Sequence, residues 1–310
     1  MVETLRPPSR LQKVATILGR RRGTEACLVI CPGPADLDSL LFVDGWRSRF
    51  SHVVAWIIDS FWTEQIPAIA RYGRVYDHLF TTGDEESSEW EQITGTPTTW
   101  LPWGSDALRF AGQRVDRVLD LLRTGRQPPE WDDDDMTANS CRSAGINFQG
   151  RPPACEDADA NQQLLMTEYA KTKFSLAFSS LVSPAPYTHP TRDYLTARWT
   201  DALAAGAVVA GIAPRVPSAR RLLWAGATLE LGTVARDEGI RVLRDAVRAW
   251  RPEHALRNRK QALERLDWRW RFRTLASALG VEPYALGTEL KVLCQLLEQG
   301  GAQCGAVRRT

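Results

Sequence analysis

The stretch that decides the fold is Asp193-Tyr-Leu-Thr-Ala-Arg-Trp-Thr-Asp201-Ala-Leu-Ala-Ala-Gly206-Ala-Val-Val-Ala-Gly211. Apolar residues recur at helical spacing, Gly206 can adopt the left-handed conformation that ends a helix, and residues 207–210 are typical of a buried strand. We therefore predict a helix that begins near Asp193, followed by a strand. Eight helical residues separate the two carboxylates by about 12 Å along the axis, which suits opposite ends of an extended polar ligand.

Carboxylates and arginines in this stretch suit different parts of such a ligand. An ionised carboxylate can accept a hydrogen bond from each of the two hydroxyl groups of a ribose diol. Each of these hydrogen bonds contributes about 1.5–3 kcal/mol when desolvated. A diphosphate needs donors instead, which makes Arg192, Arg198 and Arg151 candidates, together with a helix N-terminus. The alternative interpretation is a helix-capping Asp193 and a solvated Asp201, with no ligand.

The stretch resembles the acid-x7-acid motif of group 1 glycosyltransferases of GT-B type, where Glu-x7-Glu precedes a small-residue run and a strand. Asp193 matches the first acid, and Asp201 to Gly206 match the second acid and the run. The resemblance implies that Asp201 binds the nucleotide ribose and that Asp193 contacts the transferred sugar. Both positions carry Asp, whose side chain is about 1.5 Å shorter than Glu. The predicted donor-binding residues are Asp193, Arg198, Asp201, Arg151 and Gly206.

Two further segments extend the resemblance. Leu101-Pro-Trp-Gly104-Ser-Asp106-Ala-Leu-Arg-Phe110 resembles the Pro-Asn-Gly-Val-Asp…Phe segment that closes the N-terminal domain of these enzymes. Arg257-Asn258-Arg-Lys…Asp267-Trp268-Arg-Trp-Arg271 is similar to the closing Asn…Asp-Trp-x-x-Arg helix of the spore-maturation-like branch. The order and spacing of the three segments, over roughly residues 50–280, support the family assignment more than any one of them.

The resemblance implies an α/β fold of GT-B type, with two Rossmann-like lobes whose parallel sheets face a central cleft. It implies a retaining glycosyltransferase that moves a sugar from a UDP- or GDP-sugar type donor to a hydroxyl acceptor, without a bound cofactor or a metal. The acceptor is a small molecule, a glycan or a lipid-linked group. The alternative is a non-catalytic GT-B-like subunit that binds a sugar nucleotide or a partner. A dinucleotide oxidoreductase is disfavoured, because no Gly-x-Gly-x-x-Gly follows a predicted strand.

The N-terminal half alternates apolar runs with polar stretches, which predicts parallel strands at residues 27–31, 53–59, 78–82 and 98–101. Ligands bind at the carboxyl ends of such strands. Asp59 is therefore the candidate for a group near the acceptor or the reacting centre, and a helix cap is its alternative role. Trp62 and Trp103, at predicted strand ends, are the acceptor-side candidates for stacking on a sugar.

The domain boundary is predicted in the acidic, proline-rich stretch at residues 126–135, interpreted as a linker. The predicted domains are 1–128 on the acceptor side, 129–282 for the donor, and 283–310 as a C-terminal helix and tail. The run Asp132 to Asp135 is either a metal site or a solvated acidic stretch. Predicted helices lie at residues 115–122, 162–173, 240–250, 256–279 and 286–297, and a strand at 174–179.

A proline-rich loop at residues 183–190 is predicted to lead to Asp193 and to act as a lid over the donor. His189 in this loop lies four residues before Asp193 and is a candidate contact for phosphate or sugar. A purely structural loop histidine is the alternative. Asp59, Asp193 and His189 are thus the candidate catalytic residues.

Composition excludes several classes of protein. A net charge of +2 does not indicate a nucleic-acid-binding protein, and the apolar run at residues 53–58 is far shorter than the roughly 20 residues of a membrane span. The six cysteines form no Cys-x-x-Cys pair, which fits a reducing cytoplasm. The basic N-terminus is either a solvated helix face or a peripheral contact with anionic lipids. Its charges are Arg6, Arg10, Lys13, Arg20, Arg21 and Arg22.

Overall fold

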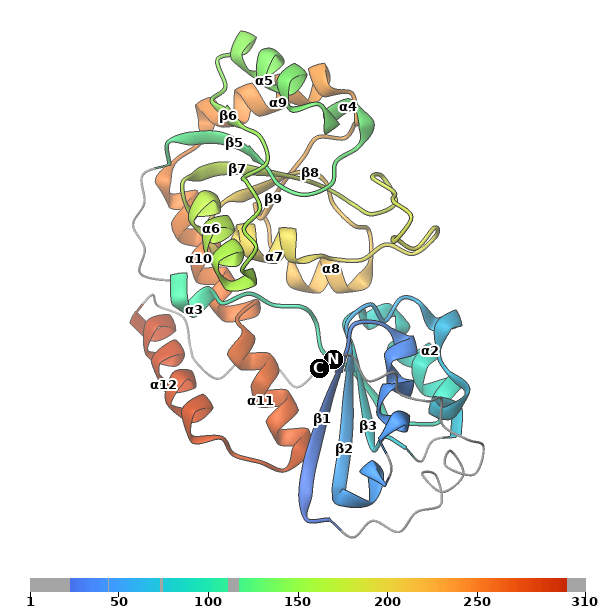
Figure 1. Ribbon diagram of the computed structural model, residues 1–310. Helices are drawn as coiled ribbons and strands as arrows, with labels where there is room; N and C mark the ends of the chain where they lie inside the picture. Colours follow the sequence, from blue (N-terminus) through green and yellow to red (C-terminus); the bar gives the residue numbers. More distant parts are fainter. Residues whose placement is uncertain (1–22, 44, 73–74, 111–116, 300–310) are drawn as a thin grey trace. The chain divides into compact units, whose positions relative to one another are not determined.

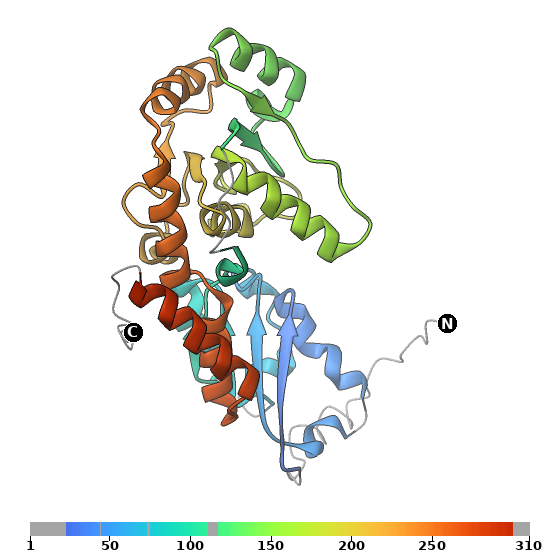
Figure 2. The ribbon, with the colours of Figure 1, turned by 90° about the vertical axis from the view of Figure 1, so that its left-hand side faces the viewer.

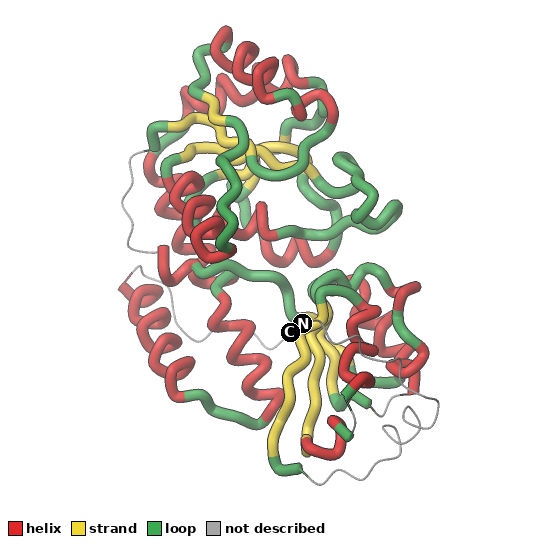
Figure 3. The backbone as a smooth tube through the Cα atoms, in the orientation of Figure 1, coloured by secondary structure: helices red, strands yellow, loops and turns green. Residues whose placement is uncertain are grey.

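The computed structural model describes residues 23–43, 45–72, 75–110 and 117–299. The chain divides into two compact units. The first contains the described part of Met1–Pro102 together with Arg271–Pro283, and the second contains Trp103–Trp270 and the described part of Tyr284–Thr310. Each unit is built on its own parallel sheet, drawn as yellow strands in Figure 3.

The first sheet has the strand order β1-β2-β3-β4, with all neighbours parallel. Its strands confirm the four predicted from the sequence: β1 Glu25–Cys31, β2 Phe50–Ile57, β3 His78–Thr81 and β4 Thr98–Trp100. The end of β2 is buried at five consecutive positions, as expected for a strand covered on both faces. Short helices connect the strands: η1 Pro34–Phe42, η2 Trp46–Arg49, η3 Thr63–Gln65, η4 Ala68–Tyr72 and α2 Asp84–Thr94.

The second sheet has the order β6-β5-β7-β8-β9 and is also parallel throughout. Its strands are β5 Leu119–Arg123, β6 Phe148–Gln149, β7 Thr172–Phe178, β8 Val208–Ile212 and β9 Thr228–Glu230. Figure 1 shows α4, α5 and α9 on one face of this sheet, and α6, α7, α8 and α10 on the other. Covering both faces explains why the central strands β7 and β8 are mostly buried.

The helices of the second unit are α3 Ala107–Phe110, α4 Pro129–Asp132, α5 Asp134–Ser143, α6 Ala158–Ala170, α7 Ala197–Ala204, α8 Pro217–Leu222, α9 Arg236–Ala249, α10 Pro252–Arg265 and α12 Tyr284–Gln299. Of these, α6, α7, α9, α10 and α12 overlap helices that the sequence predicts, whereas α3, α4, α5 and α8 are not predicted. Helix α12 packs against α10 and buries Leu293 and Leu297, as predicted for its apolar face (Figure 2). Helix α11, Trp268–Leu279, continues from the second unit into the residues of the first.

The predicted domain boundary at residues 128/129 is wrong, because the division falls between Pro102 and Trp103. The predicted helix at 115–122 is, in its described part, strand β5, which pairs with β6 and β7. A short apolar run does not by itself distinguish a helix from a buried strand. The predicted linker is also structured, since Trp131 of α4 is fully buried, 6.0 Å from the ring of Phe178.

The predicted single helix at residues 256–279 is two helices, α10 and α11. The break lies at Asp267, whose carboxylate is fully buried and accepts the backbone N–H groups of Leu108 (2.7 Å) and Arg269 (2.9 Å). Asp267 thereby caps the start of α11 and ties it to a segment far away in the sequence. This tertiary contact is not visible in the helical periodicity.

Some predictions concern the chain ends and the environment. The basic residues of the first 22 positions and the predicted tail lie outside the described residues. Among the helices that are described, none is both long and apolar enough to cross a bilayer. Cys27, Cys31, Cys141 and Cys155 are free thiols, whereas Cys294 is disulfide-bonded, which the expectation of a reducing cytoplasm does not predict.

Candidate functional site

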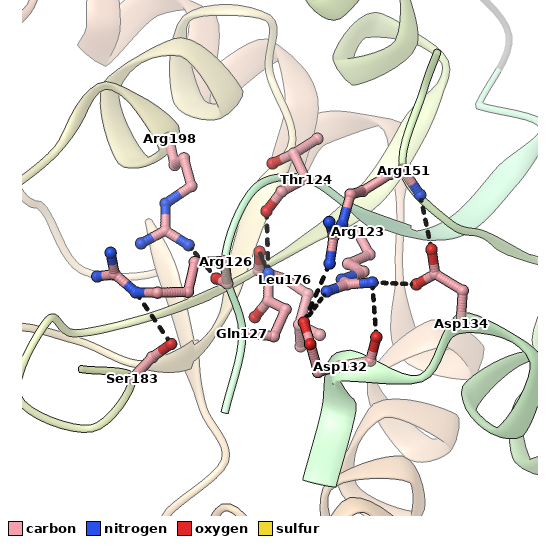
Figure 4. A network of polar contacts seen from close by, with 10 residues as sticks. All are labelled: Arg123, Thr124, Arg126, Gln127, Asp132, Asp134, Arg151, Leu176, Ser183 and Arg198. Carbon is pink, nitrogen blue, oxygen red and sulfur yellow. Dashed lines mark hydrogen bonds and ion pairs between the residues drawn. The ribbon is translucent and has the colours of Figure 1, made fainter. Parts of the chain in front are cut away.

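The carboxyl ends of β5 and β7 lie side by side in the second sheet. Strand β5 is followed by a tight turn at residues 124–127, and β7 by a long loop at residues 179–196 that leads into α7. Ligands of open α/β sheets bind at this edge. Figure 4 shows the polar residues that gather around the turn.

Two arginines meet at this edge. Arg198, in the first turn of α7, donates from Nη1 to the carbonyl oxygen of Arg126 at 2.5 Å. Arg126 in turn donates to the hydroxyl groups of Ser183 (3.2 Å) and Ser180 (3.4 Å). Burial lowers the pKa of Arg198, and the positive charge of Arg126 lowers it further. Two guanidinium groups beside a helix N-terminus make this edge suited to a bound anion.

Gly125 allows the two arginines to approach. Its φ is +61°, a left-handed conformation that favours glycine, and an added Cβ would lie 3.0 Å from Cδ of Arg198. The side chain of Arg198 therefore crosses directly over the turn that carries Arg126.

Asp193 lies near the C-terminal end of the loop at residues 179–196 that follows β7. Its Oδ1 accepts the backbone N–H groups of Ser180 and Tyr194, both at 3.1 Å. Burial raises the pKa of the carboxyl, and hydrogen bonds from the Ser179 side chain and the loop backbone oppose this. Helix α7 begins only at Ala197, so the prediction that it begins near Asp193 is wrong. The carboxylate instead folds the loop back onto the end of β7.

His189 helps to shape the same loop. Its side chain is buried, and its Nδ1 accepts the backbone N–H groups of Thr191 (3.2 Å) and Arg192 (3.0 Å). An accepting Nδ1 places the ring proton of the neutral imidazole on Nε2. The ring thus orders the turn immediately before Asp193, and its predicted catalytic role stays a prediction.

Asp201 lies inside α7, in a polar cluster made by three segments. It is 8% exposed, and its Oδ2 accepts a hydrogen bond from Nε2 of Gln162 on α6 at 3.1 Å. The hydroxyl of Ser105 lies beside the same carboxylate. Burial raises the pKa of Asp201, whereas Ser105 and Gln162 lower it. The preceding residue, Thr200, donates to the carbonyl oxygen of Gly104 at 3.0 Å.

Gly206 ends α7 in the expected left-handed region, with φ +90°. An added Cβ would lie 2.6 Å from Nη2 of Arg117 and 3.0 Å from the carbonyl oxygen of Ala255. Its immediate neighbours are therefore the side chain of Arg117 and helix α10. Direct donor binding by Gly206 remains a prediction.

The fold does not place Arg151 beside Arg198. Its Nη2 pairs with Asp132 at 3.0 Å, and its backbone N–H is bonded to Asp134. Both acids also bind the buried guanidinium of Arg123. Figure 4 shows this network and Arg198 on opposite sides of the turn at residues 124–127. The acidic run is thus partly ion-paired, which corrects its interpretation as a solvated linker.

Sequence reasoning missed Arg126, because it was assigned to the linker. The signal was present in Thr124-Gly125-Arg126, a turn directly after the apolar strand β5. Recognising residues 119–123 as a strand would have placed Arg126 at a carboxyl end, where ligands bind.

The acceptor-side candidates lie in different units. Asp59 is exposed just after β2, where its N–H donates to the carbonyl oxygen of Pro32 (2.9 Å) and partial desolvation raises its pKa. Trp62 is half-buried, with its ring centroid 6.0 Å from that of Phe61. Trp103 belongs to the second unit and packs edge-on against Trp268 at 5.0 Å. Its assignment to the same lobe as Asp59 is therefore corrected.

Apart from Leu101, Pro102 and Arg271, the three segments that carry the family resemblance belong to the second unit, where they pack together. Asn258 donates from Nδ2 to the carbonyl oxygen of Ala207 at 2.9 Å, which ties α10 to the residue before β8. Ser105 forms a parallel bridge with Asp267, and Thr200 bonds to Gly104. The described residues contain no cluster of three or more His, Cys, Asp and Glu that could hold a metal ion.

Comparison with known proteins supports the fold. No family model and no curated protein matches the sequence. Among solved structures, the chain is similar to TarM, with a TM-score of 0.50 and 9% identity over 81% of this chain and 54% of TarM. It is also similar to the UDP-forming alpha,alpha-trehalose-phosphate synthase from Burkholderia xenovorans, with a TM-score of 0.47 and 10% identity over 88% of this chain and 78% of that one.

The chain thus spans about half the length of TarM. At such low identity the likeness bears on the fold alone. Together with the two parallel sheets, it confirms the predicted α/β fold of GT-B type.

Proposed function

We propose that this protein is a glycosyltransferase that moves a sugar from a nucleoside-diphosphate sugar to a hydroxyl acceptor. The observation that carries the proposal is the meeting of Arg126 and Arg198 at the carboxyl edge of the second sheet, beside the N-terminus of α7. A diphosphate is an anion of the right kind for two guanidinium groups. The GT-B type fold and the acid-x7-acid motif on the same helix and loop support this reading.

In this proposal, Arg126 and Arg198 bind the diphosphate, Asp201 binds the ribose and Asp193 contacts the transferred sugar. Negative charge develops on the departing diphosphate in the transition state, so the two arginines supply the main electrostatic stabilisation. Arg151 holds the acidic stretch through Asp132 rather than neutralising phosphate. Asp59 and Trp62 are proposed to act on the acceptor side.

Finer features follow the resemblance and are proposed with it. They are membership of group 1 and its spore-maturation-like branch, a donor of UDP- or GDP-sugar type, retention of configuration without a required metal, and a cytoplasmic location. The donor type is the feature that decides which ligands to test first.

A thermal-shift screen tests the donor site. A ligand at one hundred times its Kd stabilises the folded protein by about 2.7 kcal/mol. We expect one nucleoside diphosphate among UDP, GDP and ADP to raise Tm by several degrees, and the Arg126→Ala/Arg198→Ala variant to lose the shift. The control Arg241→Ala, which changes an exposed residue of α9, should keep the shift in Tm.

Turnover separates the enzyme from the non-catalytic alternative. Incubation with the sugar form of the stabilising nucleotide and a set of hydroxyl acceptors should release nucleoside diphosphate. Stabilisation without release for any acceptor would favour a subunit that only binds the nucleotide sugar. No shift with any nucleotide, in a folded protein, would contradict the proposal itself.

A further inference from the structure

The surroundings of Asp201 raise the question of what keeps this carboxylate charged. The side chain is 8% exposed, and no Lys, Arg or His of the described residues forms an ion pair with it. The hydrogen bond that reaches it comes from Gln162, whose side chain extends from the exposed surface of α6 and places Nε2 3.1 Å from Oδ2. The amide of the exposed Gln162 therefore donates a hydrogen bond to the nearly buried carboxylate of Asp201.

A buried carboxylate remains an anion only where donors replace the lost water. Burial raises the pKa of Asp201, and the side chains of Ser105 and Gln162 are the groups that lower it. A carboxylate has about four acceptor sites, and Gln162 occupies one of them.

We propose that Gln162 is a positioning residue for Asp201. Its amide holds the carboxylate ionised and in a fixed orientation, so that the remaining acceptor sites meet the hydroxyl groups of a nucleoside ribose. The identity of the ligand rests on the proposed function. The contact between Gln162 and Asp201 rests only on the geometry of the second unit.

Few other charged or titratable groups act on this carboxylate. From α6, Tyr169 interacts with Asp201 electrostatically. From α10, Arg259 donates to the carbonyl oxygen of Ala205 at the end of α7. From α3, Arg109 is bonded to Gln163, and from β7, Lys173 pairs with Asp120. Of the two side chains that lower the pKa of Asp201, Ser105 is buried and Gln162 is exposed, so replacing Gln162 removes a donor with less disturbance of the packing.

Replacement of Gln162 by leucine tests the inference, because leucine has a similar size and no donor. Gln163→Leu is the matched control: Gln163 is the next residue of α6, also exposed, and bonded to Arg109 instead of Asp201. Calorimetry measures the Kd of UDP, GDP and their 2′-deoxy counterparts between pH 6 and pH 8.5. We expect Gln162→Leu to weaken ribonucleotide binding about tenfold at the low end of this pH range and less as the pH rises.

The preference for the ribonucleotide over the 2′-deoxy form should also shrink in Gln162→Leu and stay unchanged in Gln163→Leu. An equal loss at every pH and for both sugars would mean that Gln162 contributes to packing alone, and would overturn the inference.

A measurement without ligand keeps the inference separate from the proposed function. Carbon NMR of labelled aspartate, with Asp201 assigned through Asp201→Asn, reports the titration of this carboxyl directly. We expect its midpoint to move to higher pH in Gln162→Leu and not in Gln163→Leu. An unmoved midpoint overturns the inference. If instead the midpoint moves but the wild-type protein binds no nucleotide, the positioning contact stands and the proposed function falls.

Discussion

The hydroxyl of Thr200 donates a hydrogen bond to the carbonyl oxygen of Gly104, 96 residues earlier in the chain, at 3.0 Å. The contact joins helix α7, which carries Asp201, to the segment that also supplies Ser105. Gly104 is closely enclosed, since an added Cβ would lie 2.7 Å from the carbonyl oxygen of Leu266 and 2.9 Å from the ring of Trp268. The position of α7 therefore depends on a glycine at residue 104.

We expect Gly104→Ala to lower the free energy of unfolding by about 1–3 kcal/mol, because the new methyl group meets backbone and an aromatic ring that are both packed. Urea denaturation followed by tryptophan fluorescence measures the change. The control is Gly287→Ala in α12, where nothing lies within 4 Å of the added Cβ and the helix gains propensity. A Gly104→Ala protein as stable as the wild type would show that this contact is loose.

Gly125→Ala should affect both stability and donor binding. Residue 125 has φ +61°, and its added Cβ would lie 3.0 Å from Cδ of Arg198. Gly95→Ala is a matched control, because Gly95 has φ +63° with nothing within 4 Å. Both variants should lose about 1–2 kcal/mol of stability from the left-handed backbone. Only Gly125→Ala should also weaken nucleoside diphosphate binding in calorimetry, and equal binding by both variants would contradict the assigned role of Arg198.

Arg126→Ala should weaken binding of the nucleoside diphosphate identified in the screen by about 1.5–3 kcal/mol, roughly 10- to 150-fold, because charge-assisted hydrogen bonds to phosphate are lost. The loss should be smaller for the nucleoside monophosphate, which offers fewer phosphate oxygens. Arg151→Ala should change binding little, because Arg151 is paired with Asp132. A larger effect at Arg151 than at Arg126 would reverse the assignment.

Asp201→Ala should weaken donor use by roughly 2–3 kcal/mol, ~30- to 150-fold in kcat/KM, through loss of the ribose contact. The comparison is Asp135→Ala, which removes an exposed acid of α5 and should leave kcat/KM unchanged. Wild-type turnover in the Asp201 variant would remove this residue from the donor site.

The stability of the wild type should also depend on the ionisation of Asp201. Burial raises the pKa of this carboxyl above its ordinary value of 3.8, so the folded protein holds the proton more tightly than the unfolded chain. As the pH rises from about that value, the unfolded chain ionises first and stability falls until the folded carboxyl ionises as well. Asp201→Asn has no carboxyl to ionise at this position and does not lose stability in this way. The free energy of unfolding of the variant minus that of the wild type should therefore rise over the same pH window and then level off. Urea midpoints between pH 4 and pH 8 measure the difference, and a constant difference would contradict the raised pKa.

Sequence patterns predicted the elements whose signals are local. The strands of the first sheet were predicted correctly because their apolar runs are bounded by turns, and the end of α7 because Gly206 stops a helix. The runs at residues 115–122 and 256–279 were misassigned. The first is too short for periodicity to separate helix from strand, and the second is broken by Asp267 through a bond to Leu108, 159 residues away.

By itself, the sequence determined which residue types are available: two acids eight positions apart, arginines on the flanking loops and a small-residue helix stop before a strand. Only the tertiary structure decided how these groups are paired. Arg198 meets Arg126, 72 residues away, because β5 and β7 are neighbours in the sheet, whereas Arg151 pairs with Asp132 after the edge strand β6. The interaction energy of two charges depends on their separation in space, whatever their separation in the sequence. Strand order sets that distance, and no local pattern encodes it.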